Sequence, residues 1–160
     1  MGIFTWIQSI AQGKSSSYDD YKKDSNHAHA DKAEDDSSMY GLNFQQAIEA
    51  HQHWKHRLTN YVEGKSTETL DPSTICRDDK CILGIWIHTS GKESFGHIPL
   101  YTDIKDTHAQ FHTVAGDIVT RKQAGDPKGA NDLLNSGLYS KLSVNLQMML
   151  AKLYIDLGNK

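Results

Sequence analysis

Two histidines that stand one helical turn apart are the first candidates for a functional site in this sequence. His108 and His112 stand at positions i and i+4 in a run that reads as helix, so both imidazoles lie on one helical face and can bind one metal ion. Apolar residues fall on or beside that face and turn it toward a core: Ile104, Phe111, Ala115, Ile118 and Val119. The alternative interpretation is that the pair flanks a core and hydrogen bonds to carbonyl groups. The metal interpretation depends on other segments supplying further ligands.

A third histidine, His51, lies within the apolar stripe of another predicted helix. Apolar residues recur at three- and four-residue steps from Phe44 to Val62, and Gly64 marks a C-terminal stop. A histidine on a buried face needs a partner for each ring nitrogen. His51 is therefore either a hydrogen-bonded core histidine or a metal ligand.

Cys81 opens a short apolar segment that ends at Ile87, and it offers a sulfur donor. Asp78 or Asp79 could cap a short helix here, while the enrichment in isoleucine leaves a buried strand as the alternative. Three imidazoles and one thiolate suit tetrahedral zinc, which accepts mixed nitrogen and sulfur donors. Because the four ligands come from three separate elements, zinc binding would also contribute to folding.

These residues suit a di-iron site or a catalytic zinc site less well than a closed zinc site. A di-iron site is disfavoured because Glu-rich helical faces are absent. Catalytic zinc keeps an open position, whereas four protein ligands fill the tetrahedron and leave no water to activate. We therefore expect a protein that is not an enzyme, with a zinc-dependent enzyme as the alternative class.

Three motifs in order along the chain resemble the chemoreceptor zinc-binding (CZB) domain of bacterial signalling proteins. They are His51-Gln52-His53-Trp54-Lys55, then Cys81-Ile82-Leu83-Gly84-Ile85-Trp86, and finally His108-Ala109-Gln110-Phe111-His112. The resemblance extends over about residues 44–153. It implies a four-helix bundle that holds zinc through three histidines and one cysteine. Carried over to this chain, these ligands are His51, Cys81, His108 and His112.

The resemblance also suggests a function in signal transduction. The family is usually attached to a chemoreceptor signalling rod or a diguanylate cyclase, and zinc or oxidants modulate the output. Neither kind of region is found in this sequence. We expect a zinc-binding sensory domain that responds to zinc level or to oxidation of the Cys81 thiolate, which is the form that reacts with oxidants. The alternative is a structural zinc-binding module that acts in trans on a signalling partner.

Composition sets broader limits on the kind of protein. The chain has 160 residues with a formal net charge of −3, so it fits one domain plus a tail and offers no support for nucleic-acid binding. Nine histidines are unusual, and two cysteines do not make a disulfide scaffold. Neither a signal peptide nor an apolar run long enough to span a bilayer is evident. We expect a cytoplasmic protein.

The chain divides by composition into three parts. Residues 1–11 carry an apolar helical stripe (Ile3, Trp6, Ile7 and Ile10) that could dock on a signalling partner. The alternatives are contact with a membrane surface, which the lack of a Lys/Arg face disfavours, and a chain start that packs loosely or not at all. Residues 12–40 are polar and predict a disordered linker. Residues 41–158 form the zinc-binding bundle.

Within this all-α, four-helix bundle we expect three long helices and one short one. The long helices cover residues 44–62, residues 100–122 and a last run that carries Leu133 through Leu157. Gly125-Asp126-Pro127 breaks the chain before the last helix, and Gly91 to Pro99 is predicted to be a loop. The leucine-rich last helix has apolar surface to spare, which leaves a homodimer open.

Overall fold

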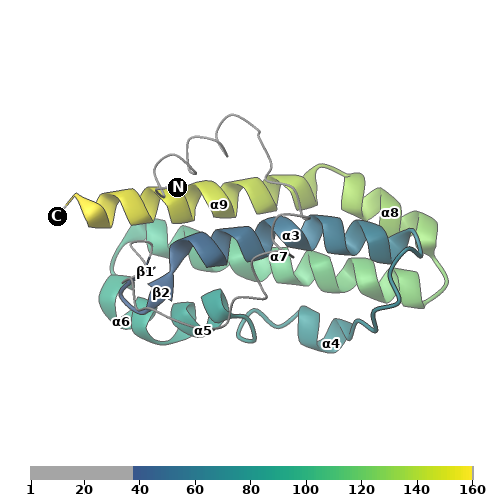
Figure 1. The fold of residues 1–160 in the computed structure, drawn as a ribbon, viewed down its shortest axis with the longest axis horizontal. Helices are drawn as coiled ribbons and strands as arrows, with labels where there is room; N and C mark the ends of the chain where they lie inside the picture. The colour runs from purple at the N-terminus through teal and green to yellow at the C-terminus, as the bar shows by residue number, and fades with distance from the viewer. Residues whose placement is uncertain (1–37, 160) are drawn as a thin grey trace, which may run out of the picture.

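The fold is an elongated helical bundle, described by a computed structural model over residues 38–159 (Figure 1). Its three long helices are α3 (Phe44–Val62), α7 (Pro99–Gln123) and α9 (Leu138–Gly158). The shorter elements are β1 (Ser38–Met39), β2 (Leu42–Asn43), α4 (Pro72–Ile75), α5 (Ile82–His88), α6 (Ser90–Phe95) and α8 (Pro127–Asn135). None of the helices in this described part is both long and apolar enough to cross a membrane.

Local capping explains where several of these helices begin. The Asn43 side chain accepts a hydrogen bond from the backbone of Gln46 at the start of α3. At the start of α8, the Asp126 side chain accepts one from the backbone of Gly129, and Pro127 occupies the first turn, where its missing N–H has no consequence. These ends are therefore encoded locally.

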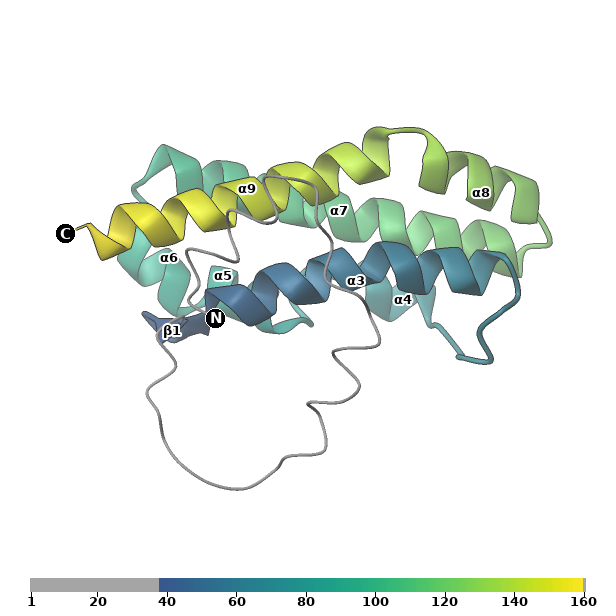
Figure 2. The same ribbon diagram turned by 45° about the horizontal axis from the view of Figure 1, so that its top comes forward.

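The long helices lie side by side, and α8 continues the bundle beyond the start of α9 (Figures 1 and 2). Two apolar clusters form the core. One gathers around α5, α6 and the C-terminal half of α9, and the other around α4, α8 and the C-terminal half of α7. The buried polar side chains belong to neither cluster: His51, His108, His112, Ser143 and Gln147. In sequence, His51, His108 and Ser143 lie between residues of the two clusters, so polar groups interrupt the core near the middle of the bundle.

The predicted all-α bundle is confirmed, and so are the helices expected near residues 44–62 and 100–122. The apolar segment after Cys81, for which a strand was the alternative, is the helix α5. The described part contains four short helices rather than one. Asp71 caps the single helical turn α4, and Pro72 is its first residue.

Two expectations about local structure are wrong. The stretch Gly91 to Pro99 is not all loop, because α6 occupies Ser90–Phe95, where Gly91 packs directly under the ring of Trp86. The last helix is also not continuous. It is broken between α8 and α9 at Gly137, whose φ of 82° lies in the left-handed region that favours glycine.

A short hairpin precedes the bundle and was not expected from the sequence. Ser38 pairs with Asn43, and Met39 pairs with Leu42. Tyr40 and Gly41 form the turn with positive φ values of 49° and 80°, as tight hairpin turns of this kind require. Residues 38–40 therefore have regular structure although they fall within the polar segment 12–40. The apolar segment 1–11 and the remainder of that polar segment lie outside the described residues.

The hairpin is attached to α5 and α6. The indole N–H of Trp86 donates a hydrogen bond of 3.0 Å to the carbonyl of Tyr40. The Tyr40 ring meets the edge of Phe95 at a centroid distance of 4.9 Å. The start of the described chain is thus packed against the helix that follows Cys81.

Candidate metal centre

Four side chains meet where the polar groups interrupt the core. One donor atom from each of His51, Cys81, His108 and His112 lies within 4.8 Å of the other three. The histidines are buried, and Cys81 is partly exposed. His51 comes from the middle of α3, the other two histidines come from α7, and Cys81 stands directly before α5.

Backbone carbonyls hold two of the imidazoles in one tautomer. His51 Nδ1 lies 2.6 Å from the carbonyl oxygen of Ala47, one turn earlier in α3. His112 Nδ1 lies 2.7 Å from the carbonyl oxygen of Ile75 at the end of α4. Because a carbonyl can only accept, each Nδ1 carries the proton and each Nε2 keeps its lone pair. Such fixing of the distal nitrogen is typical of histidines that bind metals.

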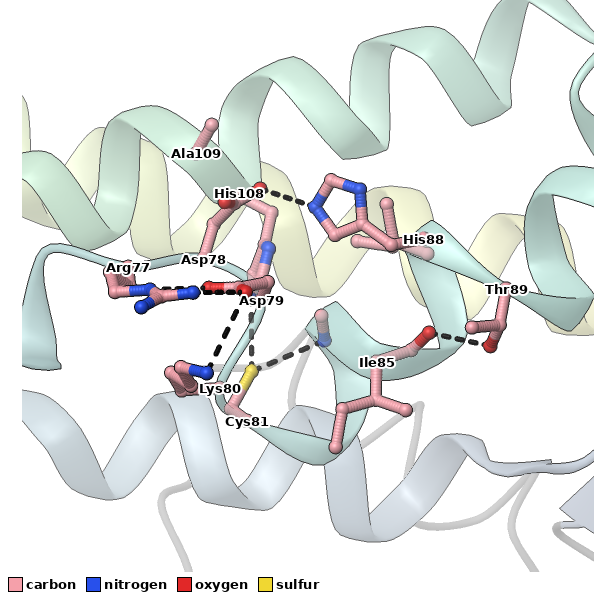
Figure 3. A network of polar contacts seen from close by, with 12 residues as sticks. Arg77, Asp78, Asp79, Lys80, Cys81, Ile85, His88, Thr89, His108 and Ala109 are labelled. Carbon is pink, nitrogen blue, oxygen red and sulfur yellow. Dashed lines mark hydrogen bonds and ion pairs between the residues drawn. The ribbon is translucent and has the colours of Figure 1, made fainter.

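The third imidazole contacts the thiol (Figure 3). His108 Nε2 lies 3.3 Å from Cys81 Sγ, and Sγ also accepts a hydrogen bond of 3.3 Å from the backbone N–H of Gly84. Cys81 is the N-cap of α5, where the amide groups of the first turn favour negative charge on the sulfur. The beginning of α5 is thereby suited to a thiolate.

The loop before Cys81 fits closely over the first turn of α5. A Cβ atom at Gly84 would lie 1.6 Å from the carbonyl oxygen of Asp78, a distance that no side chain could occupy. Farther along the loop, the carboxylate of Asp78 contacts His88 Nε2 at 2.9 Å, and Asp79 pairs with Arg77 at 2.7 Å (Figure 3). Gly84 is therefore the residue that allows the loop to bring Cys81 to α7.

Burial keeps the whole cluster neutral. It lowers the pKa of His51 to about 4 and the pKa of His108 to about 2, with a smaller lowering from the neighbouring imidazoles. Burial also lowers the pKa of His112 and raises the pKa of the Cys81 thiol. Without a metal, three uncharged imidazoles therefore face an uncharged thiol.

The donor set agrees with what a zinc ion requires. His51 Nε2 and His112 Nε2 are buried without a hydrogen-bond partner among the described residues, and buried polar atoms are seldom left in that state. Around tetrahedral zinc, nitrogen and sulfur donors are separated by about 3.5 Å. The separation of 3.3 Å between Cys81 Sγ and His108 Nε2 agrees with this value. All four donor atoms lie within 4.8 Å of one another, so small side-chain movements would bring the remaining pairs to this separation. The residues fit a closed zinc site with three nitrogen donors and one sulfur donor.

All four residues that the sequence singled out are thus brought together. Their service as metal ligands stays a prediction. The two orienting carbonyls, at Ala47 and Ile75, were not anticipated, because a backbone carbonyl has no signature in the sequence. Of the remaining described histidines, His88 and His97 are exposed and lie outside the cluster.

Residues 51–119 match the family model of the chemoreceptor zinc-binding domain. Comparisons with curated proteins and with solved structures found no match. The matched range begins at His51 and includes the other three residues of the cluster. Residues 51–119 of the chain are therefore similar to the chemoreceptor zinc-binding domain family.

Proposed function

We propose that this chain binds one zinc ion through His51, Cys81, His108 and His112, and that it works as a sensory or regulatory domain in bacterial signalling. The observation that carries the proposal is the convergence of four buried or half-buried donors, with nitrogen atoms that have no other described partner. The family match points to the same metal and to signalling. We also propose that the domain operates in the cytoplasm.

The residues divide the work of holding the ion. His51 and His112 present Nε2, because their Nδ1 protons are engaged by carbonyls. Cys81 must lose its proton, and the amide of Gly84 is placed to stabilise the resulting charge. When bound, zinc supplies the positive charge that keeps the thiolate deprotonated and joins α3, α7 and the start of α5.

A regulatory function agrees with this donor set better than catalysis does. Four protein donors complete a tetrahedron, so no coordination position remains for a substrate or for an activated water. The family is a signalling domain rather than a known enzyme family. A structural zinc module that acts in trans on a signalling partner stays the alternative.

Oxidation of Cys81 is a second candidate signal, favoured by the partial exposure of this thiol. Burial raises the pKa of the metal-free thiol, so the reactive thiolate belongs to the zinc-bound state. With a peroxide as oxidant, sulfur attacks one peroxide oxygen, the O–O bond breaks, and hydroxide leaves. Sulfur loses two electrons and becomes a sulfenic acid, a weaker ligand than the thiolate.

Elemental analysis of the purified full chain tests the zinc site. We expect about one zinc per chain, with strong loss in Cys81→Ala and His108→Ala. His97→Ala and Cys76→Ala are the matched controls, because both residues are exposed and outside the cluster. Unchanged zinc content in the Cys81 and His108 variants would overturn the proposed ligand set.

A mass-spectrometric map of oxidised cysteines, read beside a zinc-release assay, separates the two signals. If oxidation is the signal, mild peroxide should modify Cys81 before Cys76 and release zinc in step. If Cys81 stays reduced while zinc is retained, the oxidation hypothesis fails and zinc level becomes the better account. Homodimerisation and docking through residues 1–11 stay predictions for sedimentation and binding experiments.

A further inference from the structure

The single helical turn α4 lies against α7 at the metal centre, although none of its residues belongs to the three motifs. Its last carbonyl, that of Ile75, accepts the hydrogen bond from His112 Nδ1 at 2.7 Å. A helix leaves its last carbonyls without helical partners, so this oxygen is available to a side chain. The tautomer of His112 therefore depends on where α4 holds the Ile75 carbonyl.

Asp71 holds that turn together. Its Oδ1 accepts hydrogen bonds from the backbone N–H of Ser73 at 3.1 Å and from the Ser73 hydroxyl at 2.8 Å. Its Oδ2 accepts one from the Thr74 hydroxyl at 2.6 Å. The backbone carbonyl of Asp71 also accepts from the N–H of Ile75 at 3.0 Å. The hydrogen bonds from Thr74 and Ser73 lower the pKa of Asp71, so the cap is a carboxylate at neutral pH.

A close contact sets the distance between α4 and α7. A Cβ atom at Gly116 would lie 2.8 Å from Cys76 Cβ, which is closer than real side chains approach. Gly116 stands one turn after His112 on α7, and the Ile75 side chain is buried beside it in the core. The end of α4 is thus pressed onto α7 next to the imidazole that it orients.

We propose that Asp71 is a positioning residue for the zinc site. Its carboxylate holds the α4 turn, the turn holds the Ile75 carbonyl, and the carbonyl keeps the proton of His112 on Nδ1. In the other tautomer Nε2 carries the proton and has no lone pair for a metal. This inference rests on the proposed zinc site, and it adds a residue that touches neither the ion nor a ligand.

The chain offers a closely matched control for this residue. Asp126 is also an exposed aspartate that caps a helix beginning with proline, and it belongs to α8, which contributes no donor to the cluster. Replacing either aspartate by alanine removes an N-cap and destabilises a short helix. Only the change at Asp71 should alter the metal centre.

Zinc affinity of the full chain, measured by competition with a chelator, tests the proposal. We expect Asp71→Ala to weaken zinc binding by about 10-fold or more, as loss of groups that orient ligands does. Asp126→Ala should leave the affinity unchanged, and Asp71→Asn should restore much of it because asparagine is also a good N-cap. Equal affinities in the two alanine variants would overturn the proposal.

A metal-free measurement keeps this inference separate from the proposed function. The ring ¹⁵N chemical shifts of His112 report its tautomer without zinc. We expect the Nδ1–H form in the wild type and in Asp126→Ala, and a mixture of tautomers in Asp71→Ala. The same tautomer in all three proteins would refute the role of Asp71. A wild-type chain that binds no zinc would instead refute the proposed function and leave the tautomer result valid.

Discussion

Replacing His108 by leucine should separate the stability of the metal-free protein from its capacity to bind zinc. His108 is 0% exposed, and its Nδ1 has no partner among the described residues. An unsatisfied buried polar atom costs about 1–3 kcal/mol, and leucine has a similar volume. Loss of the contact between His108 Nε2 and Cys81 offsets part of the gain. The metal-free variant should therefore be more stable than the metal-free wild type by about 1 kcal/mol.

With zinc the order should reverse. A metal at about 1,000 times its Kd stabilises the folded state by about 4 kcal/mol, and the variant should lose most of this because it lacks one of four donors. In a domain of about 120 residues, 1 kcal/mol shifts Tm by about 4 °C. Thermal melts followed by circular dichroism should place the metal-free variant about 4 °C above the metal-free wild type. Zinc should then raise the wild type by about 16 °C.

Two results would contradict this prediction. If the metal-free His108→Leu protein melts below the wild type, the unpaired nitrogen does not destabilise the metal-free fold. If zinc raises the Tm of the variant as much as that of the wild type, His108 is not a ligand. His97→Leu, at an exposed position, is the control and should change neither melt.

Three further predictions follow from the same geometry. Gly84→Ala should weaken zinc binding and lower the free energy of unfolding by about 2 kcal/mol or more, because the new Cβ would lie 1.6 Å from the Asp78 carbonyl oxygen. Unchanged zinc affinity would contradict the close fit of this loop. Lowering the pH should destabilise the metal-free protein. The pKa values of His51 (about 4) and His108 (about 2) lie below the ordinary histidine value of about 6.5, so below about pH 6.5 the unfolded chain binds more protons than the folded chain. Between pH 7 and pH 5 the loss should be on the order of 3 kcal/mol in urea titrations, and a flat profile would argue against burial of these imidazoles. Gly137→Ala should lower the free energy of unfolding by about 1–2 kcal/mol, because φ is positive at this residue. The zinc affinity should stay unchanged. A loss of zinc binding would show that the break between α8 and α9 acts on the site.

Helix positions near residues 44–62 and 100–122 could be predicted because their apolar residues repeat with the helical period. The same reasoning failed in the last helix. Leu134, Leu138 and Leu142 keep the four-residue step across Gly137, so the apolar pattern runs through a position where the backbone turns left-handed. Periodicity reports which face is buried, and it does not report whether the backbone between two turns is continuous.

Short elements were missed because distant residues stabilise them. The hairpin at residues 38–43 pairs only two residues on each strand, and the indole N–H of Trp86 donates a hydrogen bond to its turn. The helix α6 lies where Gly91 passes under the same ring, in a stretch whose composition resembles a loop. Contacts so far apart in the chain leave no local pattern to recognise.

Residue types and spacing were enough to predict the four candidate donors and their order along the chain. His108 and His112 share a helical face by spacing alone, and His51 and Cys81 belong to motifs that a family model also matches. How these donors meet, and which imidazole nitrogens keep a lone pair, depends on the folded arrangement of the helices that carry them. Every residue has a backbone carbonyl, so no residue type marks the one that will accept from an imidazole. Packing of α4 on α7 selects the carbonyl of Ile75 for His112, and that choice exists only after the chain has folded.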